Sequence, residues 1–145
     1  MNVVFLSPHF PSNIYNFVRA LSQSGAVVLG VADKPYNELH SILKENLVEY
    51  YQVSNLENYE EILRAIGYFI YRYGRINCVE SHNEHWLSYE AKIREDFNIP
   101  GIRTADLQKI KRKSVMKDYF RKAGLEVVDG ILICSDIDAW QFVEK

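Results

Sequence analysis

Short apolar runs alternate with helical patterns along most of the chain, and this alternation restricts the fold more than any other feature. The runs are nearly continuous, as in parallel strands that are buried on both faces. They occupy residues 3–6, 27–31, 47–53 and 76–79. A strand followed by a helix, repeated four times, predicts an α/β fold with a Rossmann-like open parallel sheet and right-handed crossovers. The third run is less apolar, which predicts a strand nearer the edge of the sheet.

A helical pattern follows each run. The most regular one covers residues 55–74, where Asn58 can cap the helix and Gly74 can end it. A helix capped by Ser12 is expected to turn one apolar face inward. The members of that face are Ile14, Phe17, Val18 and Leu21. Further helices are expected at residues 38–43, 86–97 and 104–110.

The composition narrows the class of protein. A chain of 145 residues is the size of one ordinary domain and can bury a core of its own. Its formal net charge of -2 gives no general attraction to nucleic acids or anionic membranes, so neither is expected as a partner. No apolar run approaches a membrane span and Met1 begins no secretory signal, so a cytoplasmic location is expected. Cys78 and Cys134 lie in apolar runs, which predicts buried reduced thiols.

Two polar loops follow the first and fourth predicted strands. Ligands of open parallel sheets bind beyond the carboxyl ends of the strands, near the point where the strand order reverses. Loops 7–12 and 80–85 meet this description. The candidate substrate-binding residues are Ser7, His9 and Phe10 in the first loop and Ser81, His82, Asn83 and Glu84 in the second.

Other functions of these loops are less favoured or remain open. The first loop has no G-x-G-x-x-G pattern, and Pro8 and Pro11 lack N–H donors, which disfavours a nicotinamide dinucleotide; no P-loop occurs either. In the second loop Asn83 or Ser81 can simply cap the next helix, with solvated histidines. A metal site is not expected from this loop, because its histidines lack the i, i+4 spacing of a helical zinc site. The residues considered for it are His82, Glu84 and His85.

The C-terminal part differs from the rest. A basic cluster precedes it, made of Lys109, Lys111, Arg112 and Lys113. The cluster can bind phosphate near a helix start or form a solvated helix face. A helix at 114–123, a strand at 127–134 and a last helix capped by Ser135 or Asp136 are then expected. Three such elements cannot close a core by themselves.

The spacing of several residues resembles ATP-grasp enzymes, such as biotin carboxylases and carbamoyl-phosphate synthase large chains. The sequence has Ile99-Pro100-Gly101, a helix from Thr104, Lys113, and ten residues later Ala123-Gly124 before a new apolar run. It departs from the family pattern at Arg112, and at Leu125-Glu126 where the family has Val-Pro. The resemblance implies a pre-ATP-grasp domain at residues 1–112 and the truncated beginning of an ATP-grasp domain at 113–145.

The resemblance also implies a function. Lys113 matches the lysine that contacts ATP in the family, and the two loops would face the acceptor substrate. The family's remaining ATP- and magnesium-binding residues would lie beyond Lys145. The full-length parent would use ATP and Mg to activate a small-molecule carboxylate as an acyl phosphate and couple it to an amine or similar nucleophile. The present chain alone would be inactive, with no catalytic residues and no tightly bound cofactor.

Two alternatives remain at this point. One is a non-catalytic ligand-binding or regulatory module of Rossmann or flavodoxin-like fold. The other is half of a glycosyl- or nucleotide-sugar-dependent enzyme, since such domains share the open sheet. An exposed apolar face on helix 114–123 or on the last strand would also allow a homodimer.

Overall fold

The computed structural model describes residues 1–144, which fall into two compact units. The first unit is Met1–Thr104, and the second begins at Ala105. The domain boundary expected between residues 112 and 113 stays a prediction. None of the described helices is both long and apolar enough to cross a bilayer.

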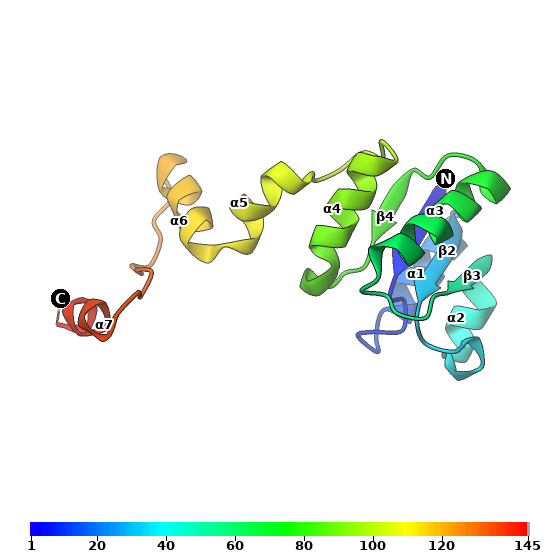
Figure 1. Ribbon diagram of the computed structural model, residues 1–145, viewed down its shortest axis with the longest axis horizontal. Coiled ribbons are helices and arrows are strands. Elements are labelled where there is room, and N and C mark those ends of the chain that lie inside the picture. Colours follow the sequence, from blue (N-terminus) through cyan, green and yellow to red (C-terminus); the bar gives the residue numbers. More distant parts are fainter. Residues whose placement is uncertain (145) are drawn as a thin grey trace. The chain divides into compact units, whose positions relative to one another are not determined.

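The first unit is built on a four-stranded parallel sheet (Figure 1). Its strands are β1 (Asn2–Leu6), β2 (Val27–Ala32), β3 (Glu49–Gln52) and β4 (Cys78–Glu80). The order across the sheet is β3-β2-β1-β4, with Val4 paired to Leu29 on one side and to Val79 on the other. The predicted α/β fold with an open parallel sheet is confirmed, and β3 is an edge strand as expected.

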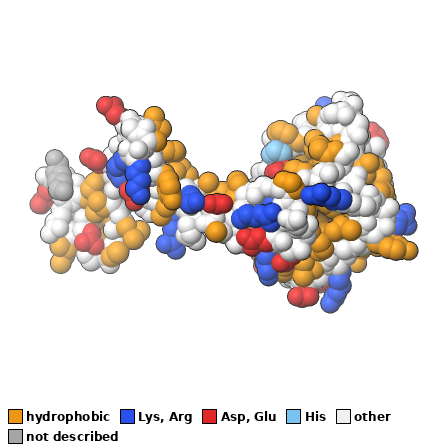
Figure 2. Space-filling view, turned by 90° about the horizontal axis from the view of Figure 1, so that it is seen from above, with side chains coloured by type: hydrophobic (Ala, Val, Ile, Leu, Met, Phe, Trp, Pro, Cys, Tyr) orange, Lys and Arg blue, Asp and Glu red, His pale blue; other side chains and the backbone are white. Residues whose placement is uncertain are grey.

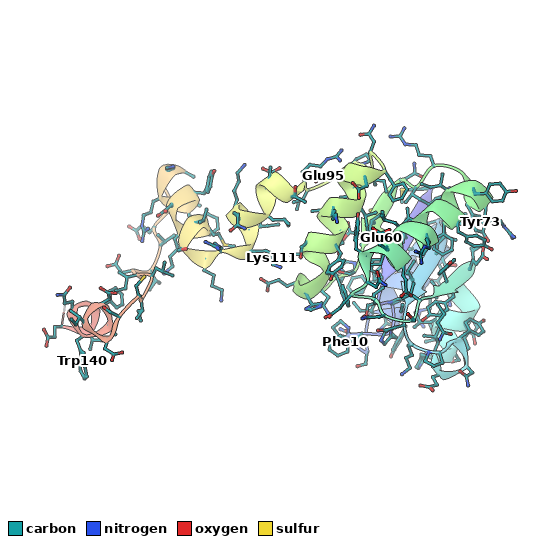
Figure 3. The ribbon with its side chains drawn as sticks, viewed as in Figure 1. Phe10, Glu60, Tyr73, Glu95, Lys111 and Trp140 are labelled. Atoms are coloured by element: carbon teal, nitrogen blue, oxygen red, sulfur yellow. The ribbon has the colours of Figure 1, made fainter. Side chains whose placement is uncertain are left out.

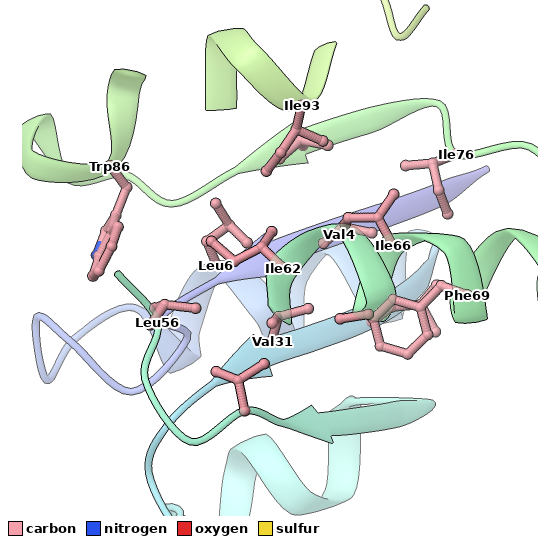
Figure 4. Close-up of a cluster of buried hydrophobic side chains, with 14 of the residues drawn as sticks. Val4, Leu6, Val31, Leu56, Ile62, Ile66, Phe69, Ile76, Trp86 and Ile93 are labelled. Carbon is pink, nitrogen blue, oxygen red and sulfur yellow. The ribbon is translucent and has the colours of Figure 1, made fainter. Parts of the chain in front are cut away.

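Helices cover both faces of this sheet. Alternate β1 side chains point to opposite faces, so Phe5 joins one buried cluster and Val4 joins the other. The Phe5 cluster lies under α1 (Tyr15–Gln23) and α2 (Ser41–Asn46). The Val4 cluster lies under α3 (Tyr59–Tyr73) and α4 (Leu87–Asp96), and Figure 4 shows it. Short 3-10 turns lie at η1 (Tyr36–Glu38), η2 (Glu84–Trp86) and η3 (Thr104–Asp106).

Helix α3 begins after Asn58, four residues later than the start of the predicted segment 55–74, and it has the two caps that the sequence predicts. The N–H of Glu60 donates to the side-chain oxygen of Asn58 at 3.2 Å, so Asn58 caps the helix. The helix ends at Gly74, whose φ of 78° suits a residue without a Cβ. The Glu61 carboxylate accepts the N–H of Ser54 at 2.6 Å and thereby ties the preceding loop to the first turn.

The start of α1 differs from expectation. Ser12 does not cap the helix, which begins at Tyr15 after the turn at Ile14. Ile14 and Val18 are buried, whereas Phe17 is 46% exposed and does not share their inward face. The packing of α1 against β1 and β2 selects a narrower apolar face than the sequence pattern suggested.

The second unit contains α5 (Leu107–Lys111), α6 (Lys113–Lys122) and α7 (Asp136–Val143). The expected cap of α7 is confirmed, because the hydroxyl of Ser135 accepts the N–H of Asp138 at 3.3 Å. The prediction of a strand at 127–134 is wrong, because this segment forms no strand in the described structure. A strand needs a neighbour for its backbone hydrogen bonds, and none is paired with it. Cys134 is consequently exposed rather than buried, and Cys78 is half-buried; both are free thiols.

Candidate functional site

The strand order creates a crevice beyond the carboxyl ends of β1 and β4. The chain moves from β1 outward to β2 and β3, then returns to place β4 on the other side of β1. The connections that follow β1 and β4 therefore leave the sheet in opposite directions, and the space between them is the usual ligand position in such sheets. We call this region the switch-point pocket.

The switch-point pocket has a volume of about 410 Å³, within the range of small-molecule sites. Its lining residues are Ser7, His9, Phe10, Asp33, Asn83, His85 and Trp86. Four of the sequence-based candidates thus line one cavity, namely Ser7, His9, Phe10 and Asn83. Figure 3 labels Phe10, which is 58% exposed on the loop after β1.

Sequence reasoning missed three lining residues. Asp33 follows β2, and its signal was the polar Asp33-Lys34-Pro35 turn directly after an apolar run. His85 and Trp86 belong to η2; from the sequence, His85 was considered only as a metal ligand, and Trp86 lies one residue beyond the second loop. The His85 and Trp86 rings meet edge to face at 4.5 Å. The pocket therefore combines one carboxylate, one hydroxyl, two imidazoles, an amide, a phenyl ring and an indole ring.

The backbone after β1 turns sharply at Ser7. Ser7 has a φ of 52°, in the left-handed region, and is 4% exposed. Its N–H continues the sheet ladder by donating to the carbonyl of Val31 at 2.9 Å, while its own carbonyl accepts the N–H of Phe10 at 3.1 Å. These bonds position the following residues, His9 and Phe10, above the end of the sheet.

His9 is half-buried, and its Nδ1 is buried with no hydrogen-bond partner in the described part of the chain. Burial lowers the pKa of this imidazole below its ordinary value of 6.5; Asp33 opposes that shift and Lys34 adds to it. His9 also lines an adjacent pocket of about 230 Å³ together with Lys34 and His40. A neutral imidazole between two cavities can donate to or accept from a polar ligand.

Asn83 organises the loop after β4. Its side-chain oxygen accepts the N–H of His85 at 3.0 Å and so begins η2. The expectation that Asn83 caps the following helical turn is confirmed. The imidazole of His85 is exposed, with Nε2 at 3.4 Å from the carboxylate of Glu57.

Three other candidates do not line the switch-point pocket. Ser81 is fully buried, and its hydroxyl donates to the carboxylate of Glu90. His82 turns to the α1 side, where its ring stacks on that of Phe17 at 4.4 Å. Glu84 is exposed at the start of η2. The left-handed φ of 53° at His82 sends neighbouring side chains in different directions, which the sequence pattern does not reveal.

Lys113 is exposed at the first position of α6, in the second unit. Arg112 precedes the helix without a side-chain cap, so the first N–H groups of α6 are free to meet an anion. No group of three or more histidine, cysteine, aspartate or glutamate side chains within residues 1–144 is arranged to hold a metal ion.

No protein-family model and no curated protein sequence matches the chain. Solved structures do match its fold, and three of them are described here. Phosphoribosylglycinamide synthetase from Anaerococcus prevotii is 12% identical with a TM-score of 0.67, over 99% of this chain and 34% of that one. L-amino acid ligase from Bacillus licheniformis is 14% identical with a TM-score of 0.62, over 91% and 35%. The biotin carboxylase domain of a single-chain bacterial carboxylase is 13% identical with a TM-score of 0.69, over 99% and 34%.

These matches are matches of fold. The chain spans about a third of the length of each structure. Its parallel sheet with helices on both faces is the pre-ATP-grasp fold of ATP-grasp ligases. The resemblance to ATP-grasp enzymes that the sequence indicated is thus confirmed at the level of fold.

Proposed function

We propose that this chain is the N-terminal part of an ATP-grasp ligase, whose switch-point pocket binds the small-molecule substrate. The observation that supports this most is the fold match with a synthetase, a ligase and a carboxylase, which takes in 91% to 99% of the chain. The reaction proposed for the parent follows from that type of enzyme. A substrate carboxylate oxygen attacks the terminal phosphorus of ATP and ADP leaves; an amine then attacks the acyl carbon and inorganic phosphate leaves.

The exposed apolar side chains of the second unit support the proposal that this chain is part of a longer protein. Large apolar side chains are exposed throughout it, and hydrophobic side chains lie on its surface in Figure 2. Ile131 is 49% exposed, Leu132 74% and Ile133 60%, in a segment whose sequence favours a strand. Such a segment is stabilised when neighbouring strands supply hydrogen bonds and cover its side chains. In the parent the second unit would be the beginning of the ATP-binding domain.

Lys113 is the residue of this chain that we propose contacts ATP. An exposed ammonium group beside free N–H groups at the start of α6 is suited to phosphate oxygens. The magnesium ions that this chemistry requires would offset charge on the transferring phosphoryl group. The residues that hold them in the parent are proposed to lie outside this chain.

The substrate-binding role is proposed for His9, Phe10 and Asn83, with Asp33 and His85 as additional polar groups. The neutral imidazole of His9 can bond a carboxylate or an amine, and the Asp33 carboxylate can pair with an ammonium group. Ser7 and Ser81 would act indirectly, by fixing the conformation of their loops. We further propose a cytoplasmic enzyme with small-molecule partners, which does not bind nucleic acids or membranes and can form a homodimer.

The products of ATP turnover test this proposal. The complete reading frame is incubated with ATP, magnesium and a mixture of carboxylic acids and amines, and the products are followed by phosphorus NMR. ADP and inorganic phosphate are expected. Lys113→Ala should raise the KM for ATP about 10- to 100-fold, the value of one charge-assisted hydrogen bond. Lys111→Ala, on the neighbouring exposed turn, is the matched control and should leave the KM unchanged.

Two results would contradict the proposal. AMP and pyrophosphate would mean activation by adenylation instead of phosphorylation. Absence of any ATP turnover, combined with saturable binding of a small molecule, would support a non-catalytic ligand-binding module. The latter function is favoured by one observation, that the switch-point pocket is made entirely from the first unit.

A further inference from the structure

A buried ion pair lies behind the switch-point pocket. Glu90 and Arg94 are one turn apart on α4, with Arg94 Nη2 at 2.9 Å from Glu90 Oε2. Glu90 is 1% exposed and Arg94 is 5% exposed. The same nitrogen of Arg94 donates to the carbonyl of Val79 at 2.6 Å and lies 3.4 Å from the carboxylate of Glu80. Arg94 therefore holds α4 against the end of β4.

The cost of this arrangement suggests a role beyond stability. Burying two charges removes hydration that their attraction only partly restores, so apolar residues of similar volume would serve the core equally well. A buried polar network that is fully hydrogen-bonded does specify one local geometry. The hydrogen-bond partners of this ion pair therefore indicate which part of the molecule it positions.

A continuous chain of hydrogen bonds runs from the ion pair to the pocket. The other oxygen of Glu90 accepts the hydroxyl of Ser81, which is fully buried. The Ser81 oxygen in turn accepts the N–H of Asn83 at 3.1 Å. Asn83 then accepts the N–H of His85 at 3.0 Å through its side chain. Asn83 and His85 both line the switch-point pocket.

Gly101 lies close to Arg94, one of the two residues of the ion pair. Its φ is 133°, and a Cβ added there would lie 2.9 Å from both Cδ and Nε of Arg94. A side chain at this position would require Arg94 to shift. The guanidinium of Arg103 also donates to the backbone carbonyl of Arg94. The close approach of Gly101 to Arg94 thus favours glycine at this position, although Gly101 does not line the pocket.

We propose that Glu90 and Arg94 are positioning residues of the switch-point pocket, which hold Asn83 and His85 in place through Ser81. Gly101 belongs to the same network because the absence of a side chain leaves room for Arg94 beside β4. The description of this cavity as a substrate pocket rests on the proposed function, whereas the positioning itself is a property of this chain.

Amide hydrogen exchange measured by NMR on the whole chain tests the positioning. Ser81→Ala removes the acceptor of the Asn83 amide, so the Asn83 and His85 amides should exchange at least about tenfold faster, the equivalent of one hydrogen bond. The amides of β1 and β2 should keep their rates. Ser88→Ala, on the exposed face of α4, is the matched control and should change neither group.

A second substitution tests the coupling at a distance. Gly101→Ala should accelerate exchange at Asn83 and His85, because the added Cβ displaces Arg94. Gly74→Ala is its control: Gly74 also has a positive φ of 78°, but no atom lies within 4 Å of its added Cβ. Backbone strain alone should therefore leave Asn83 unaffected.

Three outcomes would overturn the positioning role. They are unchanged exchange at Asn83 in Ser81→Ala, an equal acceleration of the β1 and β2 amides, or an equal response to Gly74→Ala and Gly101→Ala. In the full-length ligase, Ser81→Ala should raise the KM for the substrate and leave the KM for ATP unchanged. A parent without ligase activity would refute the proposed function and leave the exchange results valid, so the two failures are distinguishable.

Discussion

The two units of the molecule have similar local sequence patterns and very different interiors. In the first unit a parallel sheet separates two buried clusters, with Phe5 and Phe69 both fully buried. Among the described residues of the second unit only Leu107 is buried. Trp140 on α7 is 68% exposed, and Figure 3 shows it projecting from the helix.

The difference shows what an amphipathic pattern can and cannot do. A helix with an apolar face is stable when another element covers that face. The first unit supplies such elements, because each strand brings a helix back onto the sheet. Up to residue 144 the second unit has three helices and an irregular segment, which leave most apolar side chains in water. Independent stability is therefore expected of the first unit alone.

The largest expected effect comes from core substitutions in the two units. Phe69→Ala should lower the free energy of unfolding by about 3–5 kcal/mol, because a large buried side chain leaves a cavity. Trp140→Ala removes an equally large but exposed side chain and should change it by less than about 0.5 kcal/mol. Urea denaturation followed by circular dichroism measures both. Equal losses would mean that the second unit contributes a core of its own.

Ion pairs provide the next comparison. Arg94→Met leaves the Glu90 carboxylate buried without its partner, which should cost about 3–5 kcal/mol. Arg121 pairs with Asp118 at 3.1 Å in the second unit, where both side chains are largely exposed, so Arg121→Met should cost less than about 1 kcal/mol. Urea midpoints distinguish the two values. The double variant Glu90→Gln/Arg94→Met should recover part of the loss, because no charge remains buried.

A smaller effect is expected from pH. Burial lowers the pKa of folded His9 below 6.5, so between those two values the unfolded chain binds more protons than the folded chain. The contribution of His9 to stability is therefore complete above pH 6.5 and is lost as the pH falls through the folded pKa. Proton NMR titration of His9 and urea midpoints at several pH values check this. A His9 titration at or above pH 6.5 would contradict it.

The last comparison concerns reactivity instead of stability. It is the rate of thiol labelling at one cysteine in each unit. Burial, followed by the Glu80 carboxylate, raises the pKa of the Cys78 thiol to about 11, whereas Cys134 is exposed. Because the thiolate is the reactive form, Cys78 should react at least about tenfold more slowly than Cys134 at pH 8. The rates are measured with a chromogenic disulfide reagent, with Cys134→Ser to isolate Cys78. Similar rates would mean that the edge of β4 opens readily.

Much of the first unit was determined by the sequence alone. Continuous apolar runs separated by helical patterns require a parallel sheet covered on both faces, and the structure has that sheet. Asn58 and Gly74 mark the ends of α3 because capping depends only on residues within one turn. The two loops of the switch-point pocket were also identifiable, since the alternation of strands and helices already places them at the carboxyl edge of the sheet.

Only the tertiary structure decided which side chains meet there. Ser81 and His82 are adjacent in sequence, yet one is bonded to Glu90 in the interior and the other is stacked on Phe17. Asp33 enters the pocket from a third loop. Side-chain direction in a loop depends on backbone angles and on partners far away in the chain, which no local pattern contains. The same reason explains residues 127–134, whose strand propensity has no effect without a neighbouring strand to complete its hydrogen bonds.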